Sequence, residues 1–144
     1  MKIPVFSVII PAYMADQYLG EAIQSVLNQT FADFEIIVVN DASPDNTTAV
    51  VEGFDDARIQ YLIHPENRGL PATRNSAVRA SHGKYIALLD ADDVFHPDKL
   101  KAHYDYLENN PDVGISYNSR FDLGDSTQLI RRLWIAPRQI TLSD

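Results

Sequence analysis

Three carboxylates stand close together at one point of the chain, in the segment Asp90-Ala91-Asp92-Asp93. They directly follow the largely apolar run Lys84–Leu89, which has the composition of a buried strand. Neighbouring carboxylates repel one another and resist burial, so such a cluster needs a compensating charge. A divalent cation such as Mn²⁺ or Mg²⁺ supplies that charge, because it binds carboxylate, phosphate and water oxygens. The segment therefore predicts a metal site, although a solvated turn that caps a helix would also suit these residues.

Another acid, Asp41, also stands at the end of an apolar run, Glu35–Val39. A carboxylate at a strand end can accept hydrogen bonds from a ribose or a base, although Asp41 alone would more simply cap a helix or a turn. The segment Asn67–Asn75 has the composition of a loop that leads into a helix. Within it, Gly69 permits a close backbone approach, and Arg74 could pair with a phosphate, a base edge or a surface carboxylate.

Two common nucleotide-binding motifs are absent from the sequence, G-x-G-x-x-G and G-x-x-x-x-G-K-[ST]. The four histidines have no metal-ligand spacing, which favours surface or capping roles. His96, shortly after the acidic cluster, is the one best placed in sequence to touch a ligand, although a surface role explains it more simply.

The elements that must position these residues alternate along the chain. Apolar runs predict strands at Val5–Ile10, Glu35–Val39, Arg58–Ile63, Lys84–Leu89 and Val113–Tyr117. Amphipathic segments predict helices after an N-cap at Asp16, around Thr47–Phe54, from Pro71 to about Ser81 with Gly83 as the stop, and from Pro97 to Asn109.

Such alternation indicates right-handed crossovers and a mainly parallel α/β sheet with helices on both faces. Ligands bind such sheets outside the carboxyl ends of the strands, where the strand order reverses. We therefore expect three segments to lie at one edge of the sheet: Pro11-Ala12-Tyr13, Asn40-Asp41 and Asp90–Asp93.

Composition narrows the possible functions. The chain has 144 residues, with 12 lysines and arginines against 20 acids and a formal net charge of −8. This charge argues against a nucleic-acid surface, which needs cations to contact phosphates. The absence of cysteine excludes disulfide scaffolds, thiolate metal sites and a catalytic thiol. No signal peptide and no apolar run of about 18–20 residues is present, so we expect a cytoplasmic protein.

The motifs together resemble those of the family-two glycosyltransferases. Their order matches the family's, from about Val5 to Val113: an opening strand at Phe6–Tyr13, a D-x-S-x-D turn at Asp41–Asp45, an N-x-G loop at Asn67–Asn75 and a D-x-D motif at Leu89–Asp93. The resemblance implies a GT-A fold, which is a Rossmann-like α/β sandwich, and a nucleotide-diphosphate-sugar donor.

The resemblance also implies which residues bind the donor nucleotide: Pro11, Ala12, Tyr13, Asp41, Arg74, Asp90 and Ala91. The first three would contact the base through their backbone, and Asp41 would contact it through its carboxylate. Arg74 would lie near the base or the phosphates, and Asp90 would hold the ribose side. Asp92 would be the ligand of Mn²⁺ or Mg²⁺, through the diphosphate.

We therefore expect an inverting, metal-dependent glycosyltransferase that moves a sugar from a UDP-sugar to the hydroxyl of a saccharide or lipid-linked acceptor, as in glycan synthesis. Family members carry an acidic catalytic base well beyond the D-x-D motif. No Glu-Asp pair follows Asp92, and neither Asp122 nor Asp125 is assigned as base. Residues 1–119 are expected to form the nucleotide-sugar-binding core and residues 120–144 to begin an acceptor-side region, with the base beyond Asp144.

Two alternatives stay open. A sugar-nucleotide nucleotidyltransferase would also use a metal, but it should have a glycine-rich basic loop where this chain has Pro11–Ala15. A non-catalytic nucleotide-sugar-binding module is compatible with the unassigned base. A full-length enzyme is expected to lie in the cytoplasm or at the periphery of the inner membrane, without nucleic-acid partners. An interface left exposed in this chain would favour self-association.

Overall fold

The structure is a computed structural model that describes residues 3–118, 122–123 and 129–130. The chain divides into two compact units, Met1–Ala102 and His103–Asp144. Its elements, in chain order, are β1 (Phe6–Ala12), α1 (Leu19–Leu27), β2 (Phe34–Asn40), α2 (Thr47–Glu52), β3 (Ile59–Ile63), α3 (Leu70–Ala80), β4 (Tyr85–Leu88), α4 (Lys99–Asn109), β5 (Asp122–Leu123) and β6 (Leu129–Ile130).

The first unit is built on a four-stranded parallel sheet with the strand order β3-β2-β1-β4. Every residue of β1 is buried, and in β2 only Glu35 is partly exposed. Central strands of a parallel sheet are covered on both faces, which explains why their sequences are continuous apolar runs and do not alternate. The predicted α/β class with a parallel central sheet is confirmed.

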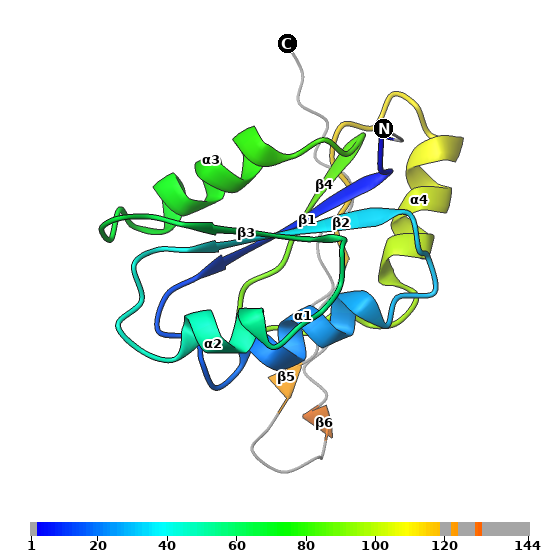
Figure 1. The fold of residues 1–144 in the computed structure, drawn as a ribbon. Coiled ribbons are helices and arrows are strands. Elements are labelled where there is room, and N and C mark those ends of the chain that lie inside the picture. The colour runs from blue at the N-terminus through cyan, green and yellow to red at the C-terminus, as the bar shows by residue number, and fades with distance from the viewer. Residues whose placement is uncertain (1–2, 119–121, 124–128, 131–144) are drawn as a thin grey trace. The chain divides into compact units, whose positions relative to one another are not determined.

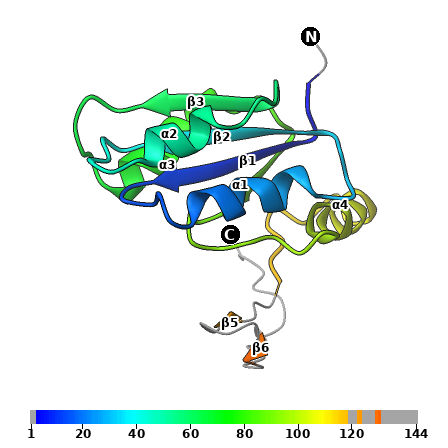
Figure 2. The same ribbon diagram turned by 60° about the horizontal axis from the view of Figure 1, so that its bottom comes forward.

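Helices cover both faces of this sheet: α3 lies on one face, and α1 and α2 lie on the other (Figure 1, Figure 2). On the α3 face, Ala77 packs into a buried cluster with Ile9, Ile37 and Val39. The two-sided arrangement follows from the strand order. The chain runs outward from β1 to β2 and β3 through α1 and α2, and then returns through α3 to β4 on the other side of β1. Crossovers are right-handed, so a connection that runs in the reverse direction along the sheet places its helix on the other face.

The start of α1 differs from the prediction. The residue before the helix is Tyr18, which makes no side-chain cap, so the expected N-cap at Asp16 is wrong. Asp16 lies in a preceding turn, in which the Leu19 amide donates to the carbonyl of Ala15 at 2.9 Å. Its carboxylate instead accepts a hydrogen bond from the Asn46 backbone at 3.4 Å, so it joins two loops.

Gly83 does not end α3 as predicted. The helix ends at Ala80, and Ser81 already has an extended backbone with φ −74° and ψ 140°. A Cβ on Gly83 would lie 2.5 Å from the Ser7 backbone nitrogen and 2.7 Å from the Phe6 carbonyl carbon. Glycine is needed here because the chain entering β4 passes directly against β1.

The strand predicted at Val113–Tyr117 is also wrong. This segment has no regular structure, and Ile115 and Tyr117 are 76% and 51% exposed. An alternating apolar pattern forms a strand only when a neighbouring strand supplies hydrogen-bond partners. In the described part of the second unit, the strands are the two-residue antiparallel pair β5 and β6. Across the described residues, no helix has the length and apolar character that a membrane crossing requires.

Candidate functional site

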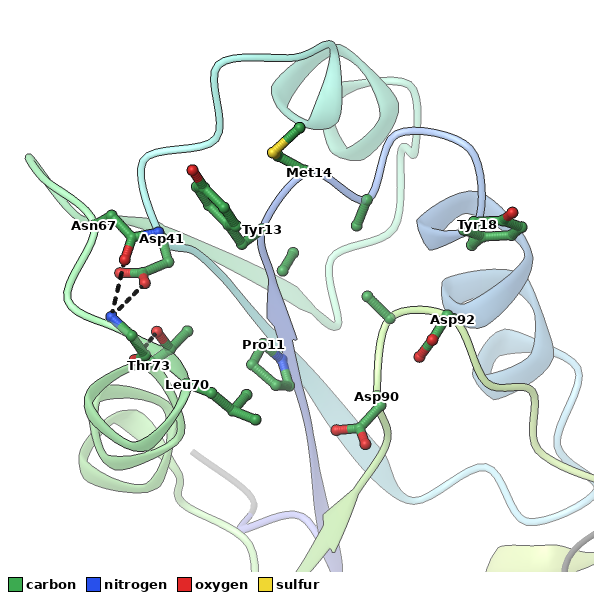
Figure 3. A pocket seen from close by; sticks show the side chains of 14 residues that line it. Pro11, Tyr13, Met14, Tyr18, Asp41, Asn67, Leu70, Thr73, Asp90 and Asp92 are labelled. Carbon is green, nitrogen blue, oxygen red and sulfur yellow. Dashed lines mark hydrogen bonds between the residues drawn. The ribbon is translucent and has the colours of Figure 1, made fainter.

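A pocket of about 610 Å³ lies at the carboxyl ends of the parallel strands. Its lining includes most of the residues predicted to bind nucleotide or metal: Pro11, Ala12, Tyr13, Asp41, Asp90, Ala91 and Asp92. Figure 3 shows Asp41 on one side of the end of β1 and Asp90 and Asp92 on the other. The strand order reverses between β1 and β4, so the pocket lies where doubly wound sheets bind ligands.

Asp41 is almost fully buried, with 3% of its surface exposed. Its Oδ1 lies 2.6 Å from Nδ1 of His64, and its carboxylate accepts hydrogen bonds from the backbone amides of Arg68 at 3.0 and 3.1 Å and Gly69 at 2.8 Å. Burial is the largest single influence on the pKa of Asp41 and raises it, but these hydrogen bonds together outweigh burial and hold the pKa below its usual value. The pocket therefore contains an ionised carboxylate on this side.

The loop after β1 forms a second wall and is fixed by the loop after β2. The backbone amides of Met14, Ala15 and Asp16 donate to side-chain oxygens of Ser43, Thr47 and Asp45, at 3.1, 3.2 and 3.1 Å. Two residues in these loops have left-handed backbones, Met14 with φ 51° and Ala42 with φ 57°. Such a conformation costs about 1–2 kcal/mol per residue outside glycine, and the cross-loop hydrogen bonds hold it in place.

The third wall is the turn into α3. Gly69 precedes the helix with φ 80° and ψ 162°, a region that is essentially restricted to glycine. This conformation turns its amide toward Asp41, and its carbonyl accepts hydrogen bonds from the Thr73 backbone at 3.1 Å and hydroxyl at 2.8 Å. Glycine is therefore needed here for its backbone conformation; a Cβ on Gly69 would meet no atom nearer than Cδ of Pro71 at 4.0 Å, so the structure shows no close approach at this residue.

Arg74 and Asp90 form an ion pair, with Nη2 of Arg74 2.6 Å from Oδ1 of Asp90. Arg74 itself does not line the pocket, but its partner Asp90 does. Within the described residues, Nε of Arg74 is the one buried side-chain polar atom that lacks a hydrogen-bond partner. The ion pair fixes the position of the Asp90 side chain at the pocket.

Asp92 is exposed at the mouth of the pocket, and no hydrogen bond or ion pair from the described part of the chain engages its carboxylate. No three His, Cys, Asp or Glu side chains of the described residues are grouped so that they could hold a metal ion by themselves. A cation bound here would need further oxygen ligands from a substrate or from water, which is how Mg²⁺ is usually held.

The segment after the acidic cluster is anchored to α1. The Phe95 amide donates to the hydroxyl of Ser25 at 3.0 Å. The side chain of Gln29 donates to the His96 carbonyl at 2.7 Å and accepts from the Leu100 amide at 2.9 Å. The His96 side chain is outside the pocket lining, so the predicted surface role suits it better than ligand contact.

Sequence reasoning did not single out several residues that line the pocket. Met14, Tyr18 and Leu70 are 63%, 54% and 47% exposed there. Their position in the sequence could have indicated a pocket, because large apolar residues close to polar loops at strand ends have no core to pack into. His64, taken from the sequence as a surface or capping residue, is 8% exposed and in contact with Asp41.

Comparison with known proteins gives one family. The model of "Glycosyl transferase family 2" matches residues 7–142. The UDP-Glc:alpha-D-GlcNAc-diphosphoundecaprenol beta-1,3-glucosyltransferase WfgD of Escherichia coli is 33% identical over 135 residues, which cover 94% of this chain and 52% of that protein.

Solved structures agree in fold. TarS 1-349 of S. aureus in complex with UDP-GlcNAc has a TM-score of 0.71 at 30% identity, covering 74% of this chain and 32% of that one. The mannosyltransferase PcManGT from Pyrobaculum calidifontis, in complex with GDP-Man and Mn²⁺, has a TM-score of 0.67 at 26% identity, covering 74% and 33%. The chain therefore spans about half the length of the E. coli relative and about a third of each of these two solved chains.

Proposed function

Because the chain belongs to glycosyl transferase family 2, we propose that it binds the donor of a reaction that transfers a sugar from a UDP-sugar to an acceptor hydroxyl. The observation that carries this proposal is the pocket at the reversal of strand order, with a buried ionised carboxylate on one side and an exposed carboxylate on the other. The first suits a base that donates N–H groups, and the second suits a cation that bridges to phosphates.

On the base side, we propose that Asp41 accepts a hydrogen bond from the base. A carboxylate has about four acceptor positions. Three protein N–H donors contact this one, and the Arg68 amide is shared between both oxygens, so one ligand donor can be added if that amide bonds a single oxygen. Uracil has a single ring N–H that fits this requirement. The backbone of Pro11, Ala12 and Tyr13 would hold the other edge of the base. Uridine is supported by the UDP-GlcNAc complex of TarS and by the UDP-Glc donor in the name of the E. coli relative.

On the phosphate side, we propose that Asp92 is a ligand of Mn²⁺ or Mg²⁺ and that the diphosphate of the donor supplies further oxygen ligands. Asp90 is already paired with Arg74, so Asp92 is the carboxylate of this loop that is available as a ligand. When bound, the cation would neutralise negative charge on the leaving nucleotide diphosphate. Arg74 would hold Asp90 toward the ribose. The Mn²⁺ in the PcManGT complex supports this assignment.

The base that activates the acceptor is proposed to lie outside the pocket lining, beyond Asp144. The pocket is lined by the carboxylates Asp41, Asp90 and Asp92, and each already has a role toward the donor. An inverting transfer needs a base within about 2.6–3.2 Å of the acceptor hydroxyl, on the face opposite the leaving group. A saccharide or lipid-linked acceptor at the cytoplasmic membrane surface is supported by the diphosphoundecaprenol acceptor in the name of the E. coli relative.

Calorimetric titration with UDP tests the proposal. We expect binding in the presence of Mn²⁺ that weakens strongly when a chelator is added. Asp41→Asn should weaken binding with and without metal, because it alters the base side. As a control, Asp55→Asn removes the same charge at an exposed position outside the pocket and should bind UDP like the parent. Absence of UDP binding would contradict the proposed function, and equal affinity after chelation would contradict the metal.

A further inference from the structure

His64 connects the pocket carboxylate to a helix. It follows β3, and its backbone amide donates to the Asn40 carbonyl at 2.9 Å. Its Nδ1 lies 2.6 Å from Oδ1 of Asp41, and its Nε2 lies 2.8 Å from the hydroxyl of Ser76 in α3. Asp41 is 3% exposed and His64 is 8% exposed, so the hydrogen bond between them is shielded from water.

This order of side chains, carboxylate to imidazole to hydroxyl, is the order of a hydrolytic triad, but the surroundings do not suit hydrolysis. Ser76 lies in the interior of α3, where backbone amides are already bonded along the helix. An acyl transfer site needs free N–H donors near the nucleophile to stabilise an oxyanion. Helix-interior amides cannot supply them, so the chain of hydrogen bonds has another role.

The geometry fixes which ring nitrogen carries the proton. The ionised carboxylate of Asp41 can only accept hydrogen bonds, so Nδ1 of His64 carries a proton and donates a hydrogen bond to Asp41. The remaining donors to Asp41 are the amides of Arg68 and Gly69, both from the loop before α3. Among the described residues, His64 is therefore the one side chain that ties this carboxylate to the end of β3.

We propose that His64 and Ser76 are positioning residues that orient the Asp41 carboxylate toward the ring N–H of the donor's base. This inference rests on the proposed function, because it assumes that Asp41 contacts the base. Ser76 holds the ring of His64, and His64 holds Oδ1, while the amides of Arg68 and Gly69 hold Oδ2. The carboxylate is thereby fixed in the orientation in which the ligand N–H would meet it. Selection of a base with a ring N–H then depends on two residues that do not line the pocket.

The test compares UDP with its N3-methyl analogue, which lacks the ring N–H. Dissociation constants of both are measured by calorimetry with Mn²⁺, and the ratio of the analogue's constant to that of UDP reports the contact with Asp41. We expect His64→Leu to weaken UDP about ten- to hundredfold, the range for a hydrogen bond to a charged group, and to bring the ratio toward one. His64→Asn retains a side-chain N–H that can reach Asp41 and should recover most of the affinity and the ratio.

Ser76→Ala should weaken UDP by a few-fold in the same direction, because it releases the ring without removing it. The matched control is Ser81→Ala, which removes a hydroxyl that bonds the Ala77 carbonyl at 2.9 Å at the far end of α3 and should leave both constants unchanged. A merely structural role of His64 would weaken both ligands equally and keep the ratio constant, which would overturn the inference. If the parent chain failed to bind UDP at all, the proposed function itself would be wrong.

Discussion

Replacing Gly83 by alanine should destabilise the fold strongly, because the new methyl group has no space beside β1. Its Cβ would lie 2.5 Å from the Ser7 nitrogen, 2.7 Å from the Phe6 carbonyl carbon and 2.7 Å from Oγ of Ser7. Two of these neighbours are backbone atoms of a fully buried central strand, which cannot rotate away. To reach even 3.0 Å from the Ser7 nitrogen, the two segments must separate by about 0.5 Å in a close-packed interior.

The cost follows from the hydrogen bonds that hold this approach. Gly83 donates to the Ser7 hydroxyl at 2.8 Å, and the amides of Lys84 and Tyr85 donate to the carbonyls of Pro4 and Val5 at 3.2 and 2.9 Å. If these three bonds, each of about 1 kcal/mol, are weakened by about 1 kcal/mol in total, and overpacking costs about 1–3 kcal/mol, the loss is about 2–4 kcal/mol. At about 3–5 °C per kcal/mol for a chain of this size, Tm should fall by about 6–20 °C.

Urea and thermal unfolding followed by circular dichroism measure this loss. The matched control is Gly20→Ala in α1, where the new Cβ would meet the nearest side-chain atom, Cγ1 of Val50, at an ordinary 3.7 Å. Alanine is favoured over glycine inside a helix by about 0.5–1 kcal/mol, so this control should be neutral or slightly stabilising. A Gly83→Ala protein within about 0.5 kcal/mol of the parent would refute the reasoning, since that is the range of harmless surface changes.

Three further outcomes are expected. Asp92→Asn should keep the Tm of the parent yet lose the Mn²⁺ dependence of UDP binding in calorimetry; a protein that melts much lower but binds UDP with metal normally would make Asp92 a structural residue. Gly69→Ala should lower the free energy of unfolding in urea by about 1–3 kcal/mol, because φ 80° with ψ 162° suits only glycine. It should also weaken UDP binding, because it disturbs the backbone amide that donates a hydrogen bond to Asp41. Unchanged stability would contradict this prediction. The hydrogen bonds from Arg58 lower the pKa of Asp56 from 3.8 to about 2, so its stabilisation is complete above pH 4 and is lost as the pH falls toward 2. Because solvent screens this pair, Asp56→Asn should lower stability at pH 7 by about 1 kcal/mol or less, and by much less near pH 2, where Asp56 is partly protonated in the folded state. A loss that is equal at both pH values would show that the charge is not the cause.

Much of the sheet was predictable from the sequence because its central strands are buried on both faces. The apolar runs at 5–10 and 35–39 lie within or beside β1 and β2. The acids that follow β2 and β4, namely Asp41, Asp90 and Asp92, line the pocket. The helix predicted from Pro71 begins one residue earlier, at Leu70, because proline is accepted in the first turn of a helix. Local chemistry and the global fold agree at these positions.

The predictions failed where a residue acts through a distant partner. Gly83 follows a helical segment and so is predicted to end the helix, but glycine is needed there because β1, which lies far away in sequence, leaves no space for a side chain. His64 has no local pattern, since its partners Asp41 and Ser76 lie on different elements. Val113–Tyr117 alternates as a strand should, yet forms none. Local sequence cannot report a contact whose other half is set by topology.

The strand order also has a consequence for how the pocket is assembled during folding. β1, β2 and β3 are consecutive in the chain and pair as neighbours, whereas β4 must return across the sheet to pair with β1. Pairings that are distant in sequence close longer loops and tend to form later. We therefore expect the wall that contains Asp41 to form earlier than the wall that contains Asp90 and Asp92. A ligand that spans both walls binds only after β4 has docked, so its binding free energy should slow amide hydrogen exchange most in β4.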